Sequence, residues 1–406
     1  MRDFLPRAAA RRRALAADAI ALFEAWGYAR LVTPMFEHVD VLERGLGDGA
    51  RAAAIRFVEP GTGEIVALRP DITPQIARVV ATRLADVPGP LRLCYDGAVM
   101  RLAGERGQRE ILQAGIELID ASEPDGDAEV LALAAAALAR LAGALDATRL
   151  DVGHVAPARH VLAAAPDPDT RRALVAAISR KDRAGVRVAA RALPAAQQRL
   201  AEALVDLWGP APATLARAAA LPWPPDVLAA FDVLRAALAG LAELAGGVLD
   251  VTADFGDLRG EGYYTGVRFA AYAAGAPEAI LRGGRYDELI GRYGRAARAT
   301  GFAIDLEAVA EAHRAHGAPI PASPPGVAIA IADAGAAAIA RELRARGVRA
   351  VVQRGVDVAW LRGAGLDHLL TSDRLIAADG ASRAATVAIS AARAGDIEPL
   401  LALLSR

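Results

Sequence analysis

The stretch that decides the predicted fold is "LRGGRYDELIGRYGRAARATGFAIDLEAV", residues 281–309. It begins like a glycine-rich turn beside a ligand pocket and ends like a strand that runs into a helix. A pocket for a nucleoside triphosphate would need a fixed cation at that junction, because a guanidinium is always charged and binds oxygens in a planar fork. The junction instead reads Asp305-Leu306-Glu307-Ala308. The stretch therefore predicts a pocket that lacks the cation.

Composition narrows the class of protein. A chain of 406 residues is long enough for two or three domains with large cores. Its net charge of −1 gives no support for nucleic-acid binding. Its single cysteine, Cys94, excludes an internal disulfide framework and is typical of a reducing cytosol. No run approaches the roughly 18 apolar residues that span a bilayer, and we expect neither a signal peptide nor a membrane location. The sequence thus predicts a cytoplasmic protein.

Local patterns place helices and strands around the quoted stretch. Residues 7–27 predict an amphipathic helix, and "AIRFVEPGTGEIVALRP" predicts a hairpin about a Pro-Gly-Thr-Gly turn. A helix is expected to start at Asp71 or Thr73. In "REILQAGIELI", residues 109–119, alternation puts Gln113, Gly115 and Glu117 on one face of a strand. An amide and a carboxylate on either side of a glycine are suited to a small ligand that lies close to the backbone.

The chain divides into two predicted domains. Residues 156–245 are mostly helical and are cut by proline-rich turns, which indicates a helical insertion. Strands return in residues 250–275 and 278–290, and a proline-rich linker covers residues 318–326. A small strand–helix–strand pattern follows it. We therefore predict a first domain over residues 1–318, with its insertion at 156–245, and a small α/β domain over residues 326–406.

Six motifs in fixed order resemble histidyl-tRNA synthetase over most of residues 1–310. They are "MRDFLP", "WGYARLVTPMFE", "ALRPDITPQIARVV", "GAVMRLAGERGQREILQAGIEL", "LRGEGYYTG" and "RGGRYDELIG…TGFAIDLEAV". The resemblance implies an α+β fold in which the antiparallel sheet of a class II aminoacyl-tRNA synthetase is flanked by helices. It also implies that the C-terminal domain is a reduced version of the family's anticodon-binding domain.

Two departures from that family concern ATP. Its second motif normally reads Phe-Arg-x-Glu, where this chain has Met100-Arg101-Leu102-Ala103. Its third motif normally ends Gly-Leu-Glu-Arg. In this chain the same motif ends Asp305-Leu306-Glu307-Ala308, with a carboxylate in place of the glycine and an alanine in place of the arginine. Each lost charge-assisted contact to a phosphate is worth about 1.5–3 kcal/mol. The resemblance thus implies that the pocket still binds the amino acid. It also implies that the pocket no longer binds ATP, because Ala103 and Ala308 replace two residues that contact it.

The resemblance also assigns a histidine-binding set. Asp71 and Thr73 match positions that hold the ammonium group, and Gln113 and Glu117 match the pair that contacts histidine. Tyr264, with Tyr263 beside it, matches a residue that reaches the imidazole. The positions near the carboxylate and its activated phosphate are matched by Arg101 and Arg259. Acids, amides and tyrosine hydroxyls can satisfy an imidazole and an ammonium, and arginine can satisfy a carboxylate.

A histidine-binding chain of this kind without the ATP residues resembles the regulatory subunit of ATP phosphoribosyltransferase. The segments "LRPDITPQIARVVA", "LDVGHVAPARHV" and "ISRKDRAGV" are similar to that family. The resemblance implies a subunit without catalysis of its own that binds L-histidine. It implies a partner, the short catalytic subunit, which this chain activates. It also implies that histidine bound to this chain inhibits that subunit, which catalyses the first step of histidine biosynthesis. It also implies a homodimer within a hetero-octamer, with no cofactor and no metal.

Other interpretations stay open at this point. Gln113 and Glu117 could face solvent, Asp71 could only cap its helix, and Arg259 could be an ordinary turn arginine. If Tyr263 and Tyr264 are extended they point to opposite faces, so that one of them is structural. The two histidines at residues 313 and 316 are more typical of a solvated helix face than of a metal site. The rival functions are an active histidyl-tRNA synthetase with degenerate ATP motifs, and a stand-alone binding module.

Overall fold

The chain folds into two compact units, residues 1–319 and 320–406, and each has a hydrophobic core of its own. The computed structural model describes residues 3–102, 109–143, 145, 148–246, 250–318, 325–333 and 335–404. Within these ranges, no helix combines the length and the apolar character that crossing a bilayer requires.

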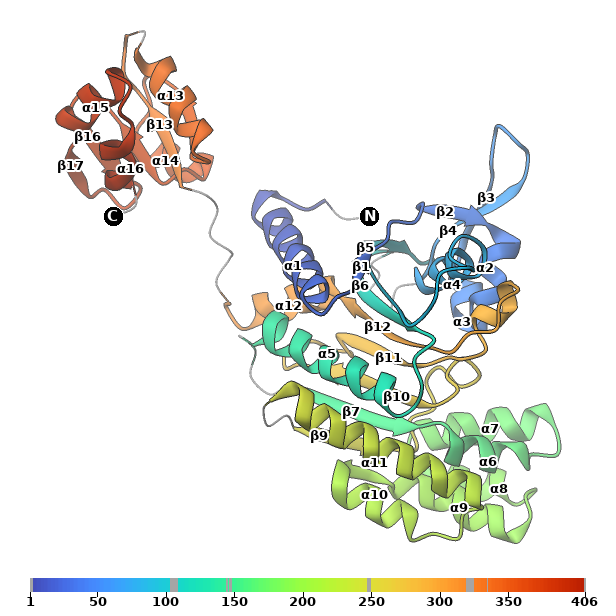
Figure 1. Cartoon of the computed structure of the whole chain (residues 1–406). Helices are drawn as coiled ribbons and strands as arrows, with labels where there is room; N and C mark the ends of the chain where they lie inside the picture. Colours follow the sequence, from blue (N-terminus) through green and yellow to red (C-terminus); the bar gives the residue numbers. More distant parts are fainter. Residues whose placement is uncertain are drawn as a thin grey trace. The chain divides into compact units, whose positions relative to one another are not determined.

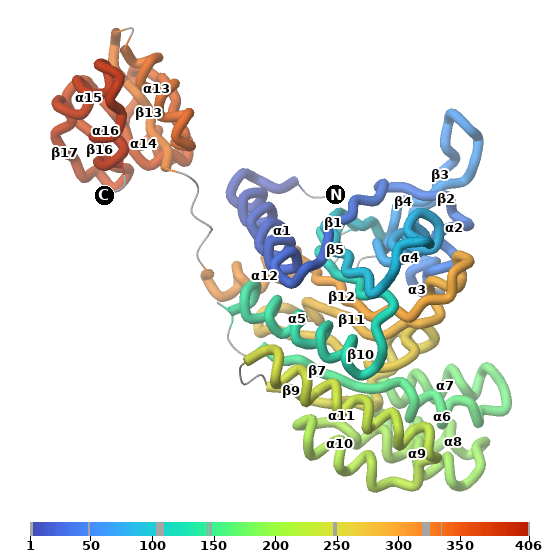
Figure 2. Tube along the Cα trace, in the orientation of Figure 1, coloured from blue at the N-terminus to red at the C-terminus, as the bar shows by residue number. Residues whose placement is uncertain are grey.

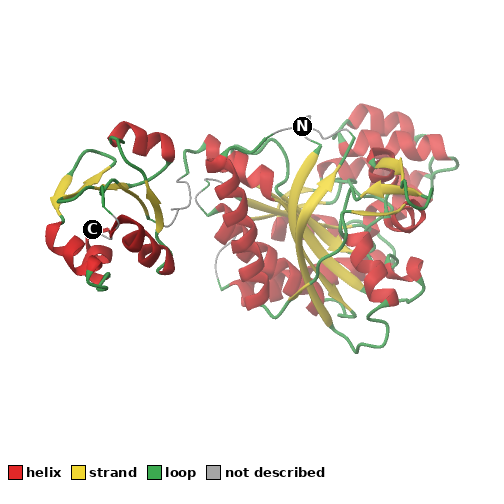
Figure 3. Cartoon of the chain, turned by 90° about the horizontal axis from the view of Figure 1, so that it is seen from above, coloured by secondary structure: helices red, strands yellow, loops and turns green. Residues whose placement is uncertain are grey.

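A nine-stranded sheet forms the centre of the first unit (Figure 1). Its strand order is β1 (Ala29–Arg30), β5 (Leu91–Met100), β6 (Glu110–Ile119), β12 (Ala299–Asp305), β11 (Leu281–Arg285), β10 (Val267–Tyr272), β7 (Arg149–His154), β9 (Val251–Asp254) and β8 (Trp208–Pro210). All neighbours are antiparallel except β1 with β5 and β7 with β9. Figure 3 shows the strands as one twisted layer with helices on both sides. The predicted α+β class with an antiparallel sheet flanked by helices is confirmed.

Three helices, α1 (Pro6–Ala25), α5 (Asp125–Ala142) and α12 (Leu306–Ala315), pack against the central strands. Phe302 on β12 meets Phe23 of α1 and Phe269 of β10 edge-on, with ring centroids 5.8 and 6.3 Å apart. Such aromatic pairs stabilise a core beyond the area that they bury. Helix α5 is rich in alanine and leucine on nearly all sides, as expected for a helix that is buried between a sheet and other helices.

A three-stranded antiparallel sheet lies near the N-terminus, in the order β2 (Phe36–His38), β4 (Ile65–Leu68) and β3 (Ile55–Val58). Its β3–β4 pair confirms the hairpin that the Pro-Gly-Thr-Gly turn predicted. Helix α4 (Thr73–Thr82) follows β4 directly, with Pro74 in its first turn. Two short helices and a 3₁₀ turn complete this region: α2 (Val39–Gly45), α3 (Asp48–Ala53) and η1 (Ile290–Tyr293).

Between β7 and β9 the chain leaves the sheet and forms a group of helices, which Figure 2 traces from one strand to the next. These helices are α6 (Ala156–Ala163), α7 (Pro168–Ser179), α8 (Arg183–Ala190), α9 (Ala195–Asp206), α10 (Ala211–Ala219) and α11 (Pro225–Ala245). The short strand β8 interrupts them and pairs with β9. It has three residues, ends on Pro210 and shows no alternating pattern, so the sequence did not predict it.

The second unit has a five-stranded sheet in the order β14 (Arg349–Val352), β13 (Gly326–Ile329), β15 (His368–Leu370), β16 (Arg374–Ala377) and β17 (Ser382–Ala384). Its helices are α13 (Gly335–Ala345), α14 (Val358–Ala364), α15 (Thr386–Arg393) and α16 (Glu398–Leu404). Strand β13 is parallel to β14 and β15, with helices as the crossovers, which is the usual arrangement of strand–helix–strand units.

His154, at the end of β7, gives the fold a measurable pH dependence. Burial, with a smaller contribution from Arg159, lowers the pKa of His154 to about 4, and its Nδ1 accepts a hydrogen bond from the Ala156 N–H at 3.1 Å. Because the unfolded chain binds this proton first as the pH falls, the stability that His154 contributes is present above pH ~6.5 and is lost towards pH ~4. Between pH ~7.5 and pH ~5, we expect the free energy of unfolding of wild type to fall by about 2 kcal/mol more than that of His154→Gln.

Urea unfolding of both proteins at the two pH values measures this difference. The other titrating groups are common to both chains, so they cancel in the comparison. Parallel changes in the two free energies of unfolding would contradict the neutral, buried state of His154.

Candidate functional site

A cavity of about 200 Å³ opens at the polar face of strands β6, β11 and β12, beside the start of α4. It is lined by Asp71, Thr73, Arg101, Ile111, Gln113, Tyr263, Tyr264, Ala279, Ile280, Leu281, Arg282, Gly283, Tyr286, Gly301, Phe302, Ala303 and Asp305. Of the eight residues that the sequence assigned to histidine, six therefore meet at this cavity. Glu117 lies beneath it, and Arg259 lies elsewhere.

Two glycines make room for the polar groups at the floor of the cavity. A Cβ at Gly115 would lie 2.5 Å from the Tyr95 hydroxyl oxygen, and a Cβ at Gly301 would lie 2.5 Å from the Tyr286 hydroxyl and 2.6 Å from Glu117 Oε2. Since side chains cannot approach so closely, any larger residue would displace these hydroxyls. Gly301 is paired with Glu117 across the β6–β12 ladder, which brings the second glycine directly opposite the carboxylate.

Glu117 is a buried acid at this floor, with 1% of its surface exposed. Tyr286 donates a hydrogen bond to its Oε2. Burial raises the pKa of Glu117 well above its ordinary value, because the charged form loses its hydration. Within the described residues, Glu117 Oε1 and Gln113 Oε1 are buried without a hydrogen bond of good geometry, although the hydroxyls of Thr73 and Tyr95 lie near the Glu117 carboxylate and partly oppose the rise of its pKa. Buried acceptors of this kind are costly unless a donor reaches them, so the floor is suited to a ligand with N–H groups.

The wall at the start of α4 carries the predicted ammonium and carboxylate contacts. Asp71 Oδ1 accepts hydrogen bonds from the backbone N–H groups of Ile72 and Thr73 at 2.7 and 3.4 Å. Asp71 therefore stabilises the first turn and also lines the cavity, and the two roles do not exclude each other. Arg101 lines the cavity too, and its Nε donates to Pro70 O at 3.1 Å. An acid and a cation on one wall can bind the two charges of an amino acid.

Three tyrosines enclose the opposite side. Tyr263 and Tyr264 lie in the segment between β9 and β10, and their rings meet edge-on with centroids 5.2 Å apart. Tyr286 follows β11, and its centroid is 5.3 Å from that of Tyr263. The segment is a turn, with the N–H groups of both Tyr263 and Tyr264 bonded to Gly260 O. The two tyrosines are therefore not extended, so the alternative in which they point to opposite faces does not apply, and both line the cavity.

Tyr286 and Arg282 are polar residues of this cavity that the sequence did not single out. Tyr286 stands in the quoted motif "RGGRYDE", directly after the glycine-rich strand β11. A tyrosine directly after a strand that contains two glycines is a usable signal, because small residues in a strand often mark the close approach of a ligand or of another group.

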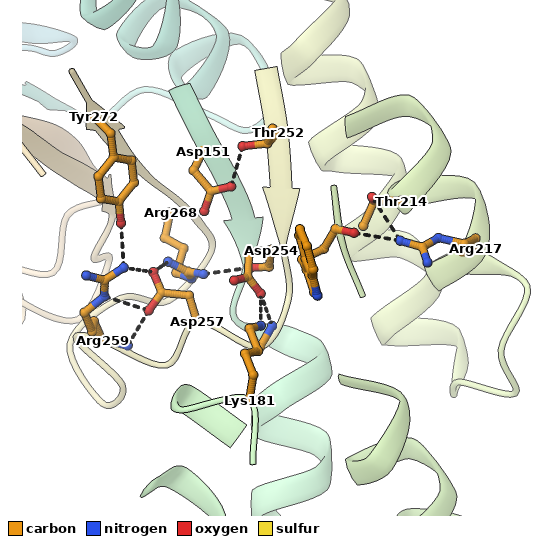
Figure 4. A network of polar contacts seen from close by, with 12 residues as sticks. Asp151, Lys181, Thr214, Arg217, Thr252, Asp254, Asp257, Arg259, Arg268 and Tyr272 are labelled. Carbon is orange, nitrogen blue, oxygen red and sulfur yellow. Dashed lines mark hydrogen bonds and ion pairs between the residues drawn. The ribbon is translucent and has the colours of Figure 1, made fainter. Parts of the chain in front are cut away.

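Arg259 does not reach this cavity. Its guanidinium forms a forked contact with Asp257, with Nε 3.0 Å from Oδ1 and Nη2 3.1 Å from Oδ2, and Nη2 also donates to the Tyr272 hydroxyl at 2.5 Å (Figure 4). Its side chain is 55% exposed and lines a separate, open cleft of about 860 Å³ beside Trp208. The interpretation of Arg259 as a turn arginine that is held by local partners fits this arrangement.

The start of α12 carries carboxylates where a triphosphate site would need a cation. Asp305 Oδ1 accepts a hydrogen bond from the Ala308 N–H at 2.9 Å and so caps the helix. Glu307 binds Arg12 of α1 at 2.6 Å. Ala308 is fully buried and belongs to the main core. The other predicted loss, Ala103, lies outside the described residues.

The two histidines at the end of α12 are engaged with backbone groups. His313 Nε2 bonds to Leu141 O at 2.8 Å, and His316 Nδ1 bonds to Ala312 O at 3.0 Å. In the part of the chain that the structure describes, no three histidine, cysteine, aspartate or glutamate residues gather in a way that could hold a metal ion.

Comparison with known proteins shows which family the chain is similar to. Residues 1–309 match the histidyl-tRNA synthetase family. The ATP phosphoribosyltransferase regulatory subunit of Anaeromyxobacter dehalogenans is 45% identical over 318 residues, which cover 77% of this chain and 89% of the relative. The regulatory subunit of Syntrophotalea carbinolica is 41% identical over 75% of this chain and 72% of the relative. A crystal structure from Bacillus halodurans, titled as an ATP phosphoribosyltransferase regulatory subunit/histidyl-tRNA synthetase, is 27% identical, with a TM-score of 0.77 over 91% of this chain and 96% of that one.

These likenesses agree with the fold and with the order of the motifs. A histidyl-tRNA synthetase from Nostoc, 19% identical with a TM-score of 0.77, shares the fold. The class II synthetase-like architecture that the motifs predicted is confirmed. The chain, whose residues 1–309 form a histidyl-tRNA synthetase-like domain, belongs to the family of ATP phosphoribosyltransferase regulatory subunits.

Proposed function

We propose that this chain is a regulatory subunit without catalysis of its own, which binds L-histidine in the cavity on β6. In this proposal it activates a short catalytic subunit of ATP phosphoribosyltransferase, and histidine bound to it inhibits the complex at the first step of histidine biosynthesis. The relatives' names support a catalytic partner. A homodimer within a hetero-octamer, located in the cytoplasm, is part of the same proposal.

The observation that carries the proposal is the contrast between the two ends of the cavity. At one end, the unpartnered acceptors of Gln113 and Glu117 are suited to the N–H groups of an imidazole. At the other end, the carboxylate of Asp305 stands at the helix start and Ala308 is buried in the core. An anion at that place opposes a triphosphate, while the acids of the cavity favour an ammonium.

The ligand of the cavity is small and carries both charges of a free amino acid. A cavity of about 200 Å³ with Asp71 and Arg101 on one wall is of a suitable size and charge for one amino acid. In the proposed pose, Glu117 accepts from the imidazole, Asp71 accepts from the ammonium and Arg101 donates to the carboxylate. Because Tyr263, Tyr264 and Tyr286 enclose the ring, little water would remain between ligand and protein.

The second candidate is an active histidyl-tRNA synthetase, which the two arginines at the cavity, Arg101 and Arg282, favour. Histidine-dependent ATP–pyrophosphate exchange separates the two functions. A synthetase exchanges pyrophosphate into ATP, whereas a regulatory subunit only binds the amino acid. We expect folded, purified chain to show no exchange above background.

The direct test is reconstitution with a short catalytic subunit of ATP phosphoribosyltransferase. We expect that subunit to transfer the phosphoribosyl group to ATP only when this chain is added, and we expect L-histidine to inhibit the mixture. Co-elution of the two chains on a sizing column should accompany the activity. Exchange at the rate of a synthetase, or a mixture that stays inactive although the two chains co-elute, would contradict the proposed function.

A further inference from the structure

The segment that carries the cavity's tyrosine pair, residues 255–266 between β9 and β10, is held from outside the cavity by the helical insertion. Tyr263 and Tyr264 line the cavity, while the backbone oxygen of Tyr264 and the side chain of Glu261 are bound by helices α6 and α7. The contacts of Arg159 and Arg171 with the segment join residues that are 90 to 105 positions apart in the chain. The insertion therefore contributes to the shape of a cavity that it does not line.

Two arginines of the insertion make the contacts nearest to the tyrosines. Arg159 of α6 donates from Nη2 to the backbone oxygen of Tyr264 at 2.7 Å. Arg171 of α7 pairs with Glu261, and its Nη1 donates to Leu162 O, near the end of α6, at 3.1 Å. Arg171 thus links both helices to the segment. A charged donor on a backbone carbonyl fixes the peptide unit that directly follows Tyr264.

The far end of the segment is held by the insertion as well. Lys181, after α7, binds Asp254 Oδ1 at 2.5 Å, and the Phe255 N–H donates to Leu207 O at 3.0 Å. Figure 4 shows Lys181 reaching Asp254 and, beside it, Asp257 between Arg259 and Arg268. Asp257 is bound by Arg268 at 2.8 Å, which ties the middle of the segment to β10.

We propose that Arg159 and Arg171 are positioning residues for the ligand cavity, and that through them the helical insertion sets the cavity's affinity for its ligand. The inference rests on the proposed function in one respect, that the ligand is L-histidine. Because coupling between two sites is reciprocal, a partner that displaces α6 and α7 changes the affinity of the cavity, and the ligand changes the affinity of that partner by the same factor.

The test is the double variant Arg159→Ala/Arg171→Ala in the full chain, with Arg172→Ala as the matched control. Arg172 is the next residue on α7, and it pairs with Asp169 of its own helix. We expect the double variant to bind L-histidine about tenfold more weakly in a calorimetric titration, with the control unchanged. Hydrogen exchange should become faster in residues 255–266 of the double variant, while the midpoint of global unfolding moves little.

A charge exchange distinguishes positioning from a general loss of structure. Arg171→Glu alone should weaken binding, and Arg171→Glu/Glu261→Arg should recover most of the lost affinity, because the ion pair is restored with reversed polarity. Wild-type affinity or wild-type hydrogen exchange of the segment in the double variant would overturn the inference. If wild type itself binds no histidine, the proposed function fails, and the exchange rates of residues 255–266 still decide whether the two arginines position the segment.

Discussion

The Glu117→Ala variant is expected to bind L-histidine about 10- to 100-fold more weakly than wild type, measured by calorimetry. Glu117 is the buried acid at the floor of the cavity, and its Oε1 has no hydrogen-bond partner within the described residues. An imidazole N–H that donates to it makes a hydrogen bond in a site of low polarity, and this bond favours the charged form of the carboxylate. The alanine variant loses that acceptor and leaves the donor of the ligand unsatisfied, and the second effect accounts for much of the loss.

The control lies on the same strand. Glu110 stands at the other end of β6, where it pairs with Arg12 at 3.1 Å and is half-exposed, so Glu110→Ala should bind histidine like wild type. Stability should change little in Glu117→Ala, because the loss of the hydrogen bond from Tyr286 is offset by the removal of a buried acid whose charged form opposes folding at neutral pH. Unchanged histidine affinity in a folded Glu117→Ala protein would remove this residue from the site.

The Arg285→Met variant is expected to unfold with a free energy about 3–5 kcal/mol lower than that of wild type, because one partner of a buried ion pair is lost. Arg285 is fully buried and lies 3.1 Å from Asp127, 3.1 Å from Glu123 and 3.2 Å from Asp287. Burial raises the pKa of Asp127 to about 6 even with the guanidinium present. Without the guanidinium, Asp127 must be buried either unpaired or protonated.

Two further variants test this explanation by urea unfolding. Arg282 lies on the same strand, but its side chain is 43% exposed and it pairs weakly with Glu278. Arg282→Ala should therefore lower the free energy of unfolding by less than about 1 kcal/mol. Arg285→Met/Asp127→Asn removes both charges and should recover a large part of the stability. A double variant as unstable as Arg285→Met alone would show that packing, rather than the unpaired carboxylate, explains the loss. Tyr286 directly follows Arg285, so the single variant should also disturb the cavity.

Much of the site could be predicted because its residues lie on regular elements. The alternation of residues 109–119 was sufficient to place Gln113 and Glu117 on one face of a strand, and the structure has that strand as β6. Asp71 and Thr73 could be placed at the start of a helix from Pro74 alone. The period of a strand or helix is set by local backbone geometry, so the direction of a side chain follows from the sequence.

The irregular segment between β9 and β10 could not be treated in this way. Its turn, closed on Gly260 O, directs both Tyr263 and Tyr264 to the cavity, whereas an extended chain would have separated them. Arg259 points to Asp257 and Tyr272 rather than to the cavity, because a nearby carboxylate and hydroxyl hold its guanidinium. The backbone of a turn depends on contacts with distant elements, here α6 and α7, which no local pattern encodes.

The sequence by itself determined the strand that carries the acid–amide pair, because the face of a strand follows from its local period. It also indicated the fold class and the missing cation at Ala308, through the resemblance of its motifs to histidyl-tRNA synthetase. The tertiary structure alone decided that Tyr286 joins Glu117, that Arg259 turns away, and that the insertion holds the tyrosine segment. The first and the third depend on residues that are far apart in the chain, whereas Arg259 is held by the nearby Asp257 and Tyr272. The meeting of distant residues is set by the packing of the whole sheet and its helices, where the free energy of burial is shared among many residues.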